Sequence, residues 1–169
     1  MHPVVGLVKN AVELYIKNGT VIRTPDGLAD VMAEKGGVFV CLKKRGELRG
    51  CIGTIEPVAG CVAEEAVRNA IHAATRDGRF PPVGEEELND LDYTVDVLCE
   101  PEEVSSPAML DPKRYGIIVS KGARRGVLLP DIEGVETAGQ QLRIAMLKAG
   151  IVPDDKDVKI KRFEVKRFK

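Results

Sequence analysis

The segment "ELRGCIGTI" at residues 47–55 places a thiol, a cation and two glycines within one predicted strand. It follows the apolar run "GVFVCLKK", and Arg45-Gly46 between them is a turn sequence, so the two runs are predicted to form a β-hairpin. Side chains alternate along a strand, which gives the returning arm an apolar face and a face able to do chemistry. The apolar face holds Leu48, Gly50 and Ile52, and the other face holds Arg49, Cys51 and Gly53.

Two interpretations fit this hairpin. In the first, the arginine favours the thiolate, so Cys51 is a candidate catalytic nucleophile or covalent attachment point. Gly53 would then let a ligand approach bare backbone, and Arg49 and Gly50 would complete the ligand site. In the second, Cys51 is a small core residue and the two glycines bend the strand. The residue pattern leaves both interpretations open.

Further arginines extend the candidate ligand site. Arg79 follows a predicted helix and precedes Phe80 and two prolines, so a rigid turn presents its guanidinium either to an anionic group or to loop carbonyls. Arg125, in a second predicted hairpin, is either a second anion contact or a solvated strand residue. The motifs contain no obvious acidic partner for these arginines, so the predicted ligand is anionic. The acidic segment "GEEELND" at 84–90 is interpreted as solvated surface.

A general base for Cys51 is not evident in the sequence. His72 falls on the polar face of a predicted helix at 58–76, away from the apolar stripe of that helix. The other residues on this predicted polar face are Glu65, Arg68 and Asn69. Nucleophilic catalysis would therefore depend on arginine alone or on a carboxylate such as Asp77, which weakens the enzyme hypothesis.

Composition excludes several classes of protein. The four cysteines lack the paired spacing of a structural zinc site, and two histidines are too few for a histidine-rich one, so no metal site or cofactor is predicted. The cysteines are interpreted as reduced, buried thiols. A net charge of −1 gives no general attraction to nucleic acid or to a membrane surface. No apolar run reaches the roughly 20 residues of a membrane span, and the N-terminus lacks a secretory signal, so a cytoplasmic protein is expected.

Hydrophobic periodicity gives the expected order of helices and strands. Helices are predicted at 3–18, 58–76 and 135–149, with a short helical segment at 26–35 that turns Leu28, Val31 and Met32 inward. Strands are predicted at 38–44, 47–55, 92–100, 116–120, 124–130 and 157–165. The two halves share one element order, and aligning their hairpins superimposes Arg49-Gly50 on Arg125-Gly126, which indicates an internal duplication.

The predicted fold class is α+β. Two similar hairpin-helix-strand repeats form a mostly antiparallel, curled or barrel-like sheet with helices packed on it. A single domain is expected over 1–169, with a helical N-terminal segment at 1–36, a first repeat at 37–104 and a second repeat at 105–169.

Four segments of the chain resemble the signatures of the AMMECR-type domain family. They are "LRGCIGT" in the first hairpin, "AATRDGRFPPVGEEEL" at 73–88, "YGIIVSKGARRGVLLPDI" at 115–132 and "QLRIAMLKAGI" at 141–151. The likeness runs from about Gly37 to the C-terminus. It implies an α+β domain of two similar repeats around a barrel-like sheet, without an established activity. It also implies an association with a Memo-type dioxygenase-like protein and a radical-SAM protein, which accompany some family members.

The resemblance also assigns motif positions. The matching residues are Arg49, Gly50, Cys51, Ile52 and Gly53, then Arg79, Phe80, Pro81 and Pro82, and finally Arg125, Gly126, Leu129 and Pro130. The chain departs from the family pattern at two positions. Gly78 stands where the family usually has a proline, which makes the turn less rigid. Asp131 stands where a glutamine is common, which puts a charge in place of an amide and brings recognition of any ligand there into question.

Three functions follow as hypotheses. The leading one is a cytoplasmic ligand- or protein-binding accessory domain with an anion-accepting cleft near the first hairpin, where Arg49, Cys51 and Gly53 meet Arg79 and Phe80 and face Arg125. The alternative is an enzyme that uses Cys51 as its nucleophile or covalent attachment point. The third is binding of single-stranded nucleic acid by the basic and aromatic tail "KIKRFEVKRFK", which the overall charge disfavours.

Overall fold

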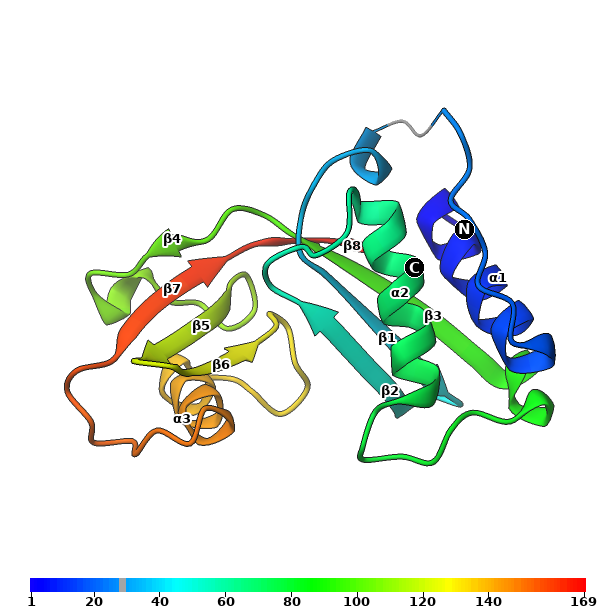
Figure 1. Ribbon diagram of the computed structural model, residues 1–169. Helices are drawn as coiled ribbons and strands as arrows, with labels where there is room; N and C mark the ends of the chain where they lie inside the picture. The colour runs from blue at the N-terminus through cyan, green and yellow to red at the C-terminus, as the bar shows by residue number, and fades with distance from the viewer. Residues whose placement is uncertain (28–29) are drawn as a thin grey trace. The chain divides into compact units, whose positions relative to one another are not determined.

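Strands β1 (Val38–Lys44) and β2 (Glu47–Thr54) form the predicted hairpin in the computed structural model, which describes residues 1–27 and 30–169. Both turn residues have left-handed backbone, with φ 53° at Arg45 and 86° at Gly46. Two consecutive positive φ angles characterise the tight turn whose twist suits a two-residue hairpin. The chain divides into two compact units, Met1–Leu98 with Lys166–Lys169, and Cys99–Val165 (Figure 1).

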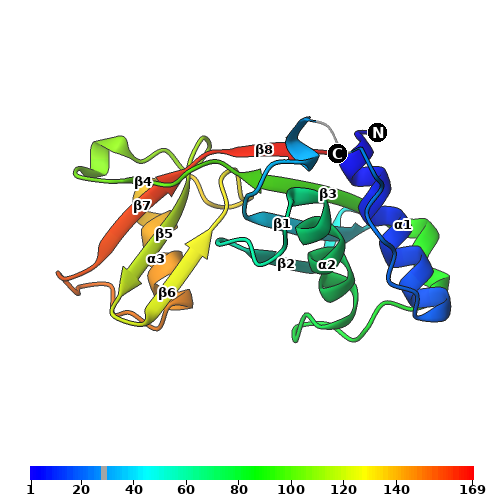
Figure 2. The same cartoon turned by 45° about the horizontal axis from the view of Figure 1, so that its top comes forward.

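The first unit contains one four-stranded sheet. Its strand order is β2-β1-β3-β8, where β3 spans Leu91–Leu98 and β8 spans Val165–Phe168. Strand β1 pairs antiparallel with both β2 and β3, so β2 lies at one edge of the sheet. Helices α1 (Pro3–Asn18) and α2 (Val62–Thr75) lie on one face (Figures 1 and 2). The side chains buried between them include Val4, Val8, Ala66, Ala70, Val38, Val40, Leu42 and Val95.

Local sequence signals explain the bounds of α1. His2 caps the helix, because its side chain accepts a hydrogen bond from the Val4 N–H, and Pro3 occupies the first helical position. Gly19 ends the helix in the left-handed conformation, with φ 72°. The predicted helix at 3–18 is therefore confirmed. The short segment predicted at 26–35 contains a 3₁₀ turn at Asp30–Met32, and the prediction for Leu28 lies outside the described residues.

Helix α2 begins four residues later than predicted. The N–H groups of Val58 and Ala59 donate to the Glu65 carboxylate at 2.9 and 2.7 Å. These residues therefore form a loop held by the helix and not its first turn. Glu65 and Asn69, which were predicted on the polar face of the helix, are both buried against the sheet. Asn69 donates to the Val38 carbonyl at 2.9 Å and to Thr54 Oγ1 at 3.1 Å, which in turn donates to Glu65 at 2.6 Å.

The second unit repeats the hairpin-and-helix arrangement. Its sheet has the order β4-β7-β5-β6, with strands at Glu102–Glu103, Lys159–Phe163, Gly116–Lys121 and Arg124–Leu128 respectively. Helix α3 (Ala138–Lys148) packs on hairpin β5–β6 and starts at a Thr137 capping box. The strand predicted at 157–165 is split, because the chain passes from β7 in this sheet to β8 in the sheet of the first unit.

The Arg-Gly dipeptides of the two hairpins have a shared packing role. A Cβ atom added at Gly50 would lie 2.1 Å from the Ala73 carbonyl oxygen of α2, and one at Gly126 would lie 2.1 Å from the Ala145 carbonyl oxygen of α3. In each half the glycine therefore lets the following helix lie directly on the second strand of the hairpin. This physical equivalence supports the internal duplication read from the sequence.

The α+β class and the antiparallel pairing are confirmed, with one correction to the sheet. The strands form two four-stranded sheets, and over the described residues neither closes into a barrel. The boundary between the two units falls at Leu98–Cys99, six residues before the predicted boundary between the repeats at 104–105. None of the described helices is both long and apolar enough to span a bilayer.

Candidate functional site

Strand β2 contains a β-bulge at Arg49. Gly50 pairs with Leu42, whereas the adjacent pair joins Lys43 to Leu48, so Arg49 has no partner of its own on β1. An extra residue reverses the alternation of side chains on one side of the bulge. Leu48 is consequently 41% exposed, and its predicted place on the core face is wrong. Ile52, beyond the bulge, packs against the core as predicted.

The guanidinium of Arg49 is held by a carboxylate from the segment after α2. Its Nε and Nη2 donate to the two Glu87 oxygens at 3.0 and 2.8 Å, and it also donates to the carbonyls of Pro81 and Pro82. Lys44 donates to the same carboxylate at 2.9 Å. The side chains of Arg49 and Glu87 are each 12% exposed, so Arg49 is a structural ion-pair partner in a mostly buried position.

This pairing corrects two expectations. The arginines of the motifs do have acidic partners, and Glu87 of the "GEEELND" segment is not solvated surface. Hydrogen bonds from Arg49 and then Lys44 hold the pKa of Glu87 well below its ordinary value, against the opposing effect of burial. Glu87 is therefore ionised at neutral pH and keeps the hairpin attached to the 3₁₀ helix Glu85–Asp90.

Asp77 and Arg79 together occupy the open edge of β2. The Cys51 N–H donates to Asp77 Oδ2 at 2.9 Å, and Arg79 Nη2 donates to the Cys51 carbonyl at 3.4 Å. Arg79 also donates two hydrogen bonds to Asp77, from Nε to Oδ1 at 2.9 Å and from Nη2 to Oδ2 at 2.7 Å. Edge strands carry unpaired backbone groups that attract other chains, and this pair of side chains satisfies both groups at Cys51. The hydrogen bonds from Arg79 are the main reason that the pKa of Asp77 is depressed.

Arg79 nevertheless keeps an accessible part. Its side chain is 57% exposed, and its Nη1 donates no hydrogen bond to the residues that the structure describes. Its guanidinium carbon lies 5.5 Å from the centroid of the Phe80 ring, and that of Arg49 lies 6.0 Å from the same ring. The structure thus brings Arg49, Arg79 and Phe80 together, as predicted.

Cys51 is bonded to Cys41, which lies directly opposite on β1. The expectation of four reduced thiols is wrong for this pair, whereas Cys61 and Cys99 are free. A regular hairpin around Arg45-Gly46 would pair Cys41 with Gly50, and the extra residue at Arg49 moves Cys51 into register. The disulfide was therefore not predictable without the bulge. In this form Cys51 has no thiol to act as a nucleophile.

Both glycines of the motif are covered by other groups. Gly53 pairs with Phe39, and a Cβ atom at Gly53 would lie 2.1 Å from Cγ of that ring. Gly50 lies under the Ala73 carbonyl of α2. Neither offers the bare backbone expected for a ligand. An aromatic ring over a cross-strand glycine is a known way to compensate for the missing side chain.

The remaining predicted residues lie in the second unit. Arg125 is an exposed residue of β6, opposite Ser120. Asp131 has a left-handed backbone with φ 56°, and its side chain is 61% exposed and lies 4.0 Å from the Lys113 ammonium. Among the described residues there is no group of three or more side chains that could hold a metal ion.

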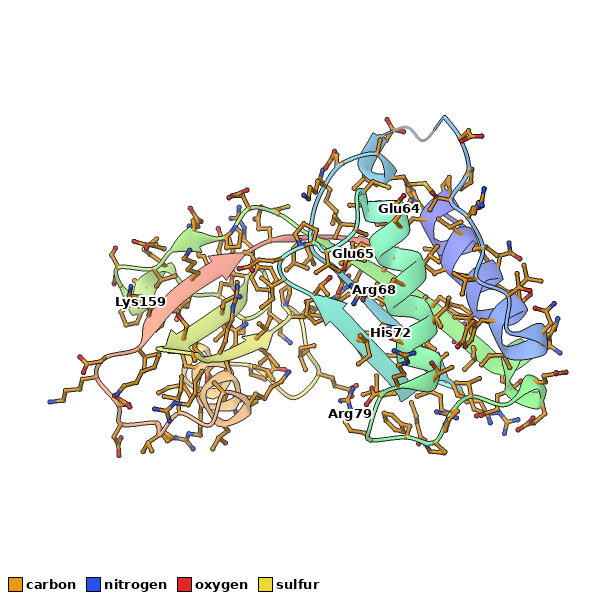
Figure 3. All side chains as sticks on the ribbon, viewed as in Figure 1. Glu64, Glu65, Arg68, His72, Arg79 and Lys159 are labelled. Atoms are coloured by element: carbon orange, nitrogen blue, oxygen red, sulfur yellow. A yellow bond between two sulfur atoms is a disulfide. The ribbon has the colours of Figure 1, made fainter. Side chains whose placement is uncertain are left out.

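Sequence reasoning missed a groove along the outer side of α2. Its volume is about 600 Å³, and it runs between α2 and the segment that follows α1. Arg68 and His72 project from the same side of α2 (Figure 3) and line it together with Arg23 and Arg76. The spacing of Arg68, His72 and Arg76 at intervals of four residues is a signal that the sequence did contain.

Comparison with known proteins identifies the family of this chain. A family model described as AMMECR1 matches residues 5–168. A protein of Thermotoga maritima is 51% identical over 99% of this chain and 98% of its own length. A protein of Clostridium acetobutylicum is 48% identical over 99% of this chain, which spans only 36% of that longer relative. The crystal structure of the uncharacterized protein PH0010 from Pyrococcus horikoshii matches with a TM-score of 0.90 at 35% identity, over 97% of this chain and 88% of that one. The chain belongs to the AMMECR1 family.

Proposed function

We propose that this chain is a binding accessory domain that accepts an anionic group at the exposed guanidinium of Arg79. The proposal rests on the hydrogen bonds and the exposure of the Arg79 side chain. Two of its three guanidinium nitrogens are fixed by Asp77 and the Cys51 carbonyl, while the third, Nη1, donates no hydrogen bond within the described residues, and the side chain is 57% exposed. A guanidinium that is already held in place loses little conformational freedom when a carboxylate or phosphate binds.

The alternative, an enzyme with Cys51 as its nucleophile, has less support. The sulfur of Cys51 is bonded to Cys41, and the nearest ionised groups, Asp77 and Arg79, are engaged with each other and with the Cys51 backbone. The Clostridium relative, in which a domain of this kind makes up 36% of the chain, also agrees with an accessory role beside other segments.

Binding of single-stranded nucleic acid has the least support. Phe163 is 1% exposed, so it belongs to the core and cannot stack on a base. Phe168 stacks on His2, with the ring centroids 4.1 Å apart. The aromatic residues of the basic tail are thus already used by the fold.

The test is an NMR titration of the full chain with inorganic phosphate. The ¹⁵N–¹H resonances of Arg79 Nε and of the Cys51 amide are expected to shift and saturate in the wild type. The variant Arg79→Lys keeps a positive charge beside Asp77 but loses the guanidinium donors, so its affinity for phosphate, read from the Cys51 amide, is expected to be about tenfold weaker. The control is Arg45→Lys in the hairpin turn, since the Arg45 side chain is 79% exposed and is paired with Asp90 of the 3₁₀ helix Glu85–Asp90. Equal responses in Arg79→Lys and the wild type would contradict the proposal.

A further inference from the structure

The groove over α2 has the size of a small-molecule site. Its volume is about 600 Å³, within the roughly 300–1,000 Å³ that is typical of ligand pockets. One wall is the outer side of α2, and the other is the segment Val21–Thr24. It lies within the first unit, and Arg79 does not line it.

The floor of this groove is apolar. Val67 and Ile71 of α2 belong to a small hydrophobic cluster, to which Tyr15 and Ile22 contribute partly buried side chains. Val21, which also lines the groove, is 63% exposed. These side chains offer an apolar or aromatic molecule a surface to pack on.

The walls of the groove are cationic. Arg23, Arg68 and Arg76 line it, and none of them forms a salt bridge within the described part of the chain. Glu64 is a carboxylate of the same lining, and it accepts a hydrogen bond from the Gly60 N–H at 2.9 Å, at the first turn of α2. Glu64, and the buried Glu65 whose charge acts on Arg68, offset part of the positive charge, but the three arginines outnumber the one carboxylate of the lining.

His72 also lines the groove, and the pKa of its imidazole responds to the neighbouring arginine charges. Burial, followed by the charges of Arg76 and Arg68, lowers the pKa of the imidazole below its ordinary value. The ring is consequently neutral at pH 7 and can donate or accept a hydrogen bond at the apolar floor.

We infer that this groove binds a small amphipathic anion, whose apolar body packs on Val67 and Ile71 and whose phosphate, sulfonate or carboxylate group pairs with the arginines of the walls. Such a ligand satisfies both halves of the lining, because the floor excludes water from an apolar body and the guanidinium groups recognise planar or tetrahedral anions. The inference does not depend on Arg79, so it can hold or fail independently of the proposed function.

The direct test uses 1-anilinonaphthalene-8-sulfonate, a fluorescent amphipathic anion, with the folded full chain. The wild type is expected to enhance its fluorescence saturably, and Arg68→Gln and Arg76→Gln are each expected to weaken binding about tenfold. The matched control is Arg143→Gln, which removes an exposed helical arginine from α3 and should leave the affinity unchanged. Equal affinity in the wild type and both groove variants would overturn the inference.

Two further measurements identify the class of ligand. Octyl phosphate should displace the probe at a lower concentration than inorganic phosphate or a hexaglutamate peptide. If hexaglutamate is the most effective competitor, the groove is a peptide-docking surface and the inference is wrong. In NMR titrations, octyl phosphate should raise the pKa of His72, because the bound anion offsets the arginine charges. The imidazole resonances of His2, which does not line the groove, should not move when the ligand is added at constant pH. An unchanged pKa at His72 in the presence of saturating octyl phosphate would contradict binding in this groove.

Discussion

Arg49 and Arg79 each meet a carboxylate that follows α2 in the chain, but the two pairs differ in what they leave accessible. Arg49 and Glu87 are both 12% exposed and satisfy each other. Asp77 is 5% exposed while its partner Arg79 is 57% exposed. The first pair therefore fastens the hairpin, and the second pair both fastens the edge of β2 and keeps a guanidinium available to a ligand.

Replacing Glu87 with glutamine should destabilise the fold at neutral pH. The change leaves the charged donors of Arg49 and Lys44 without their carboxylate, at an expected cost of about 1–3 kcal/mol. Because the pKa of Glu87 is lowered in the folded state, its contribution is present above the pKa of an unfolded glutamate, about 4.3, and is lost as the pH falls below that value. Urea unfolding at a series of pH values from 7 to 2 measures this contribution to the free energy of unfolding.

The role of the Glu87 carboxylate is tested by the pH dependence of the free energy of unfolding. The free energy of unfolding of Glu87→Gln should fall less on acidification than that of the wild type. Glu133→Gln, at an exposed position of the second unit, is the control and should behave as the wild type does. Parallel curves for the wild type and Glu87→Gln would show that this carboxylate does not contribute as described.

The state of Cys51 can be tested by counting thiols. In denaturant without reductant, two thiols per chain should react with a thiol reagent, those of Cys61 and Cys99. After reduction all four cysteines should react. Peptide mapping should find Cys41 linked to Cys51. Four reactive thiols before reduction would reopen the nucleophile interpretation of Cys51.

At the scale of elements, the hairpin-helix contact depends on a glycine in each half. Gly50→Ala and Gly126→Ala place a Cβ atom 2.1 Å from a helix carbonyl oxygen, so the helix must move away from the sheet. Overpacking of this kind typically costs about 1–3 kcal/mol or more. Gly139→Ala, within α3, meets nothing within 4 Å and should instead stabilise by up to about 1 kcal/mol through helix propensity. Thermal unfolding of the three variants measures the contrast; a neutral effect at Gly50 and Gly126 would contradict the packing role.

The turn after α2 offers a stabilising substitution. The Phe80 N–H donates to the Asp77 carbonyl at 3.0 Å, which makes Gly78 the second residue of a four-residue turn, and a Cβ atom there meets nothing within 4 Å. Proline is favoured at this turn position. Gly78→Pro should therefore raise the free energy of unfolding by about 0.4–1 kcal/mol, mainly by restricting the unfolded chain. Gly78→Ala is the matched control and should gain less. A lower melting temperature for Gly78→Pro would show that proline does not fit the turn.

Element types were predictable because they follow from local periodicity and capping. Helix α1 has the predicted bounds, and hairpin β1–β2 forms around Arg45-Gly46 as expected. The bulge at Arg49 was not predictable, because it has no local signature and arises where the chain accommodates α2 on Gly50 and Glu87 beside Arg49. One extra residue then changed the face of Leu48 and brought Cys51 opposite Cys41. The pairing of Arg49 with Glu87 was missed because the two residues lie 38 positions apart, whereas Asp77 lies only two residues from Arg79 and was a local signal that the sequence did contain.

At the scale of the whole molecule, the chain is an AMMECR1-family domain built of two similar hairpin-and-helix units. Both units use an Arg-Gly hairpin, and the first contains the disulfide, the bulge at Arg49 and the pairs Arg49–Glu87 and Arg79–Asp77. The candidate binding features, Arg79 with Phe80 and the groove over α2, therefore belong to the first unit. The function that we propose therefore depends on residues of the first unit.

The central claim is that this domain binds an anion through Arg79 and does not require sulfur chemistry. The most direct measurement is the inorganic phosphate titration of the Arg79 Nε resonance in the wild type and in the double variant Cys41→Ser/Cys51→Ser, with folding of the variant checked by its amide spectrum. Saturating shifts of similar size and midpoint are expected in both proteins. A response that is absent from the wild type, or that disappears with the two sulfur atoms, would contradict the claim.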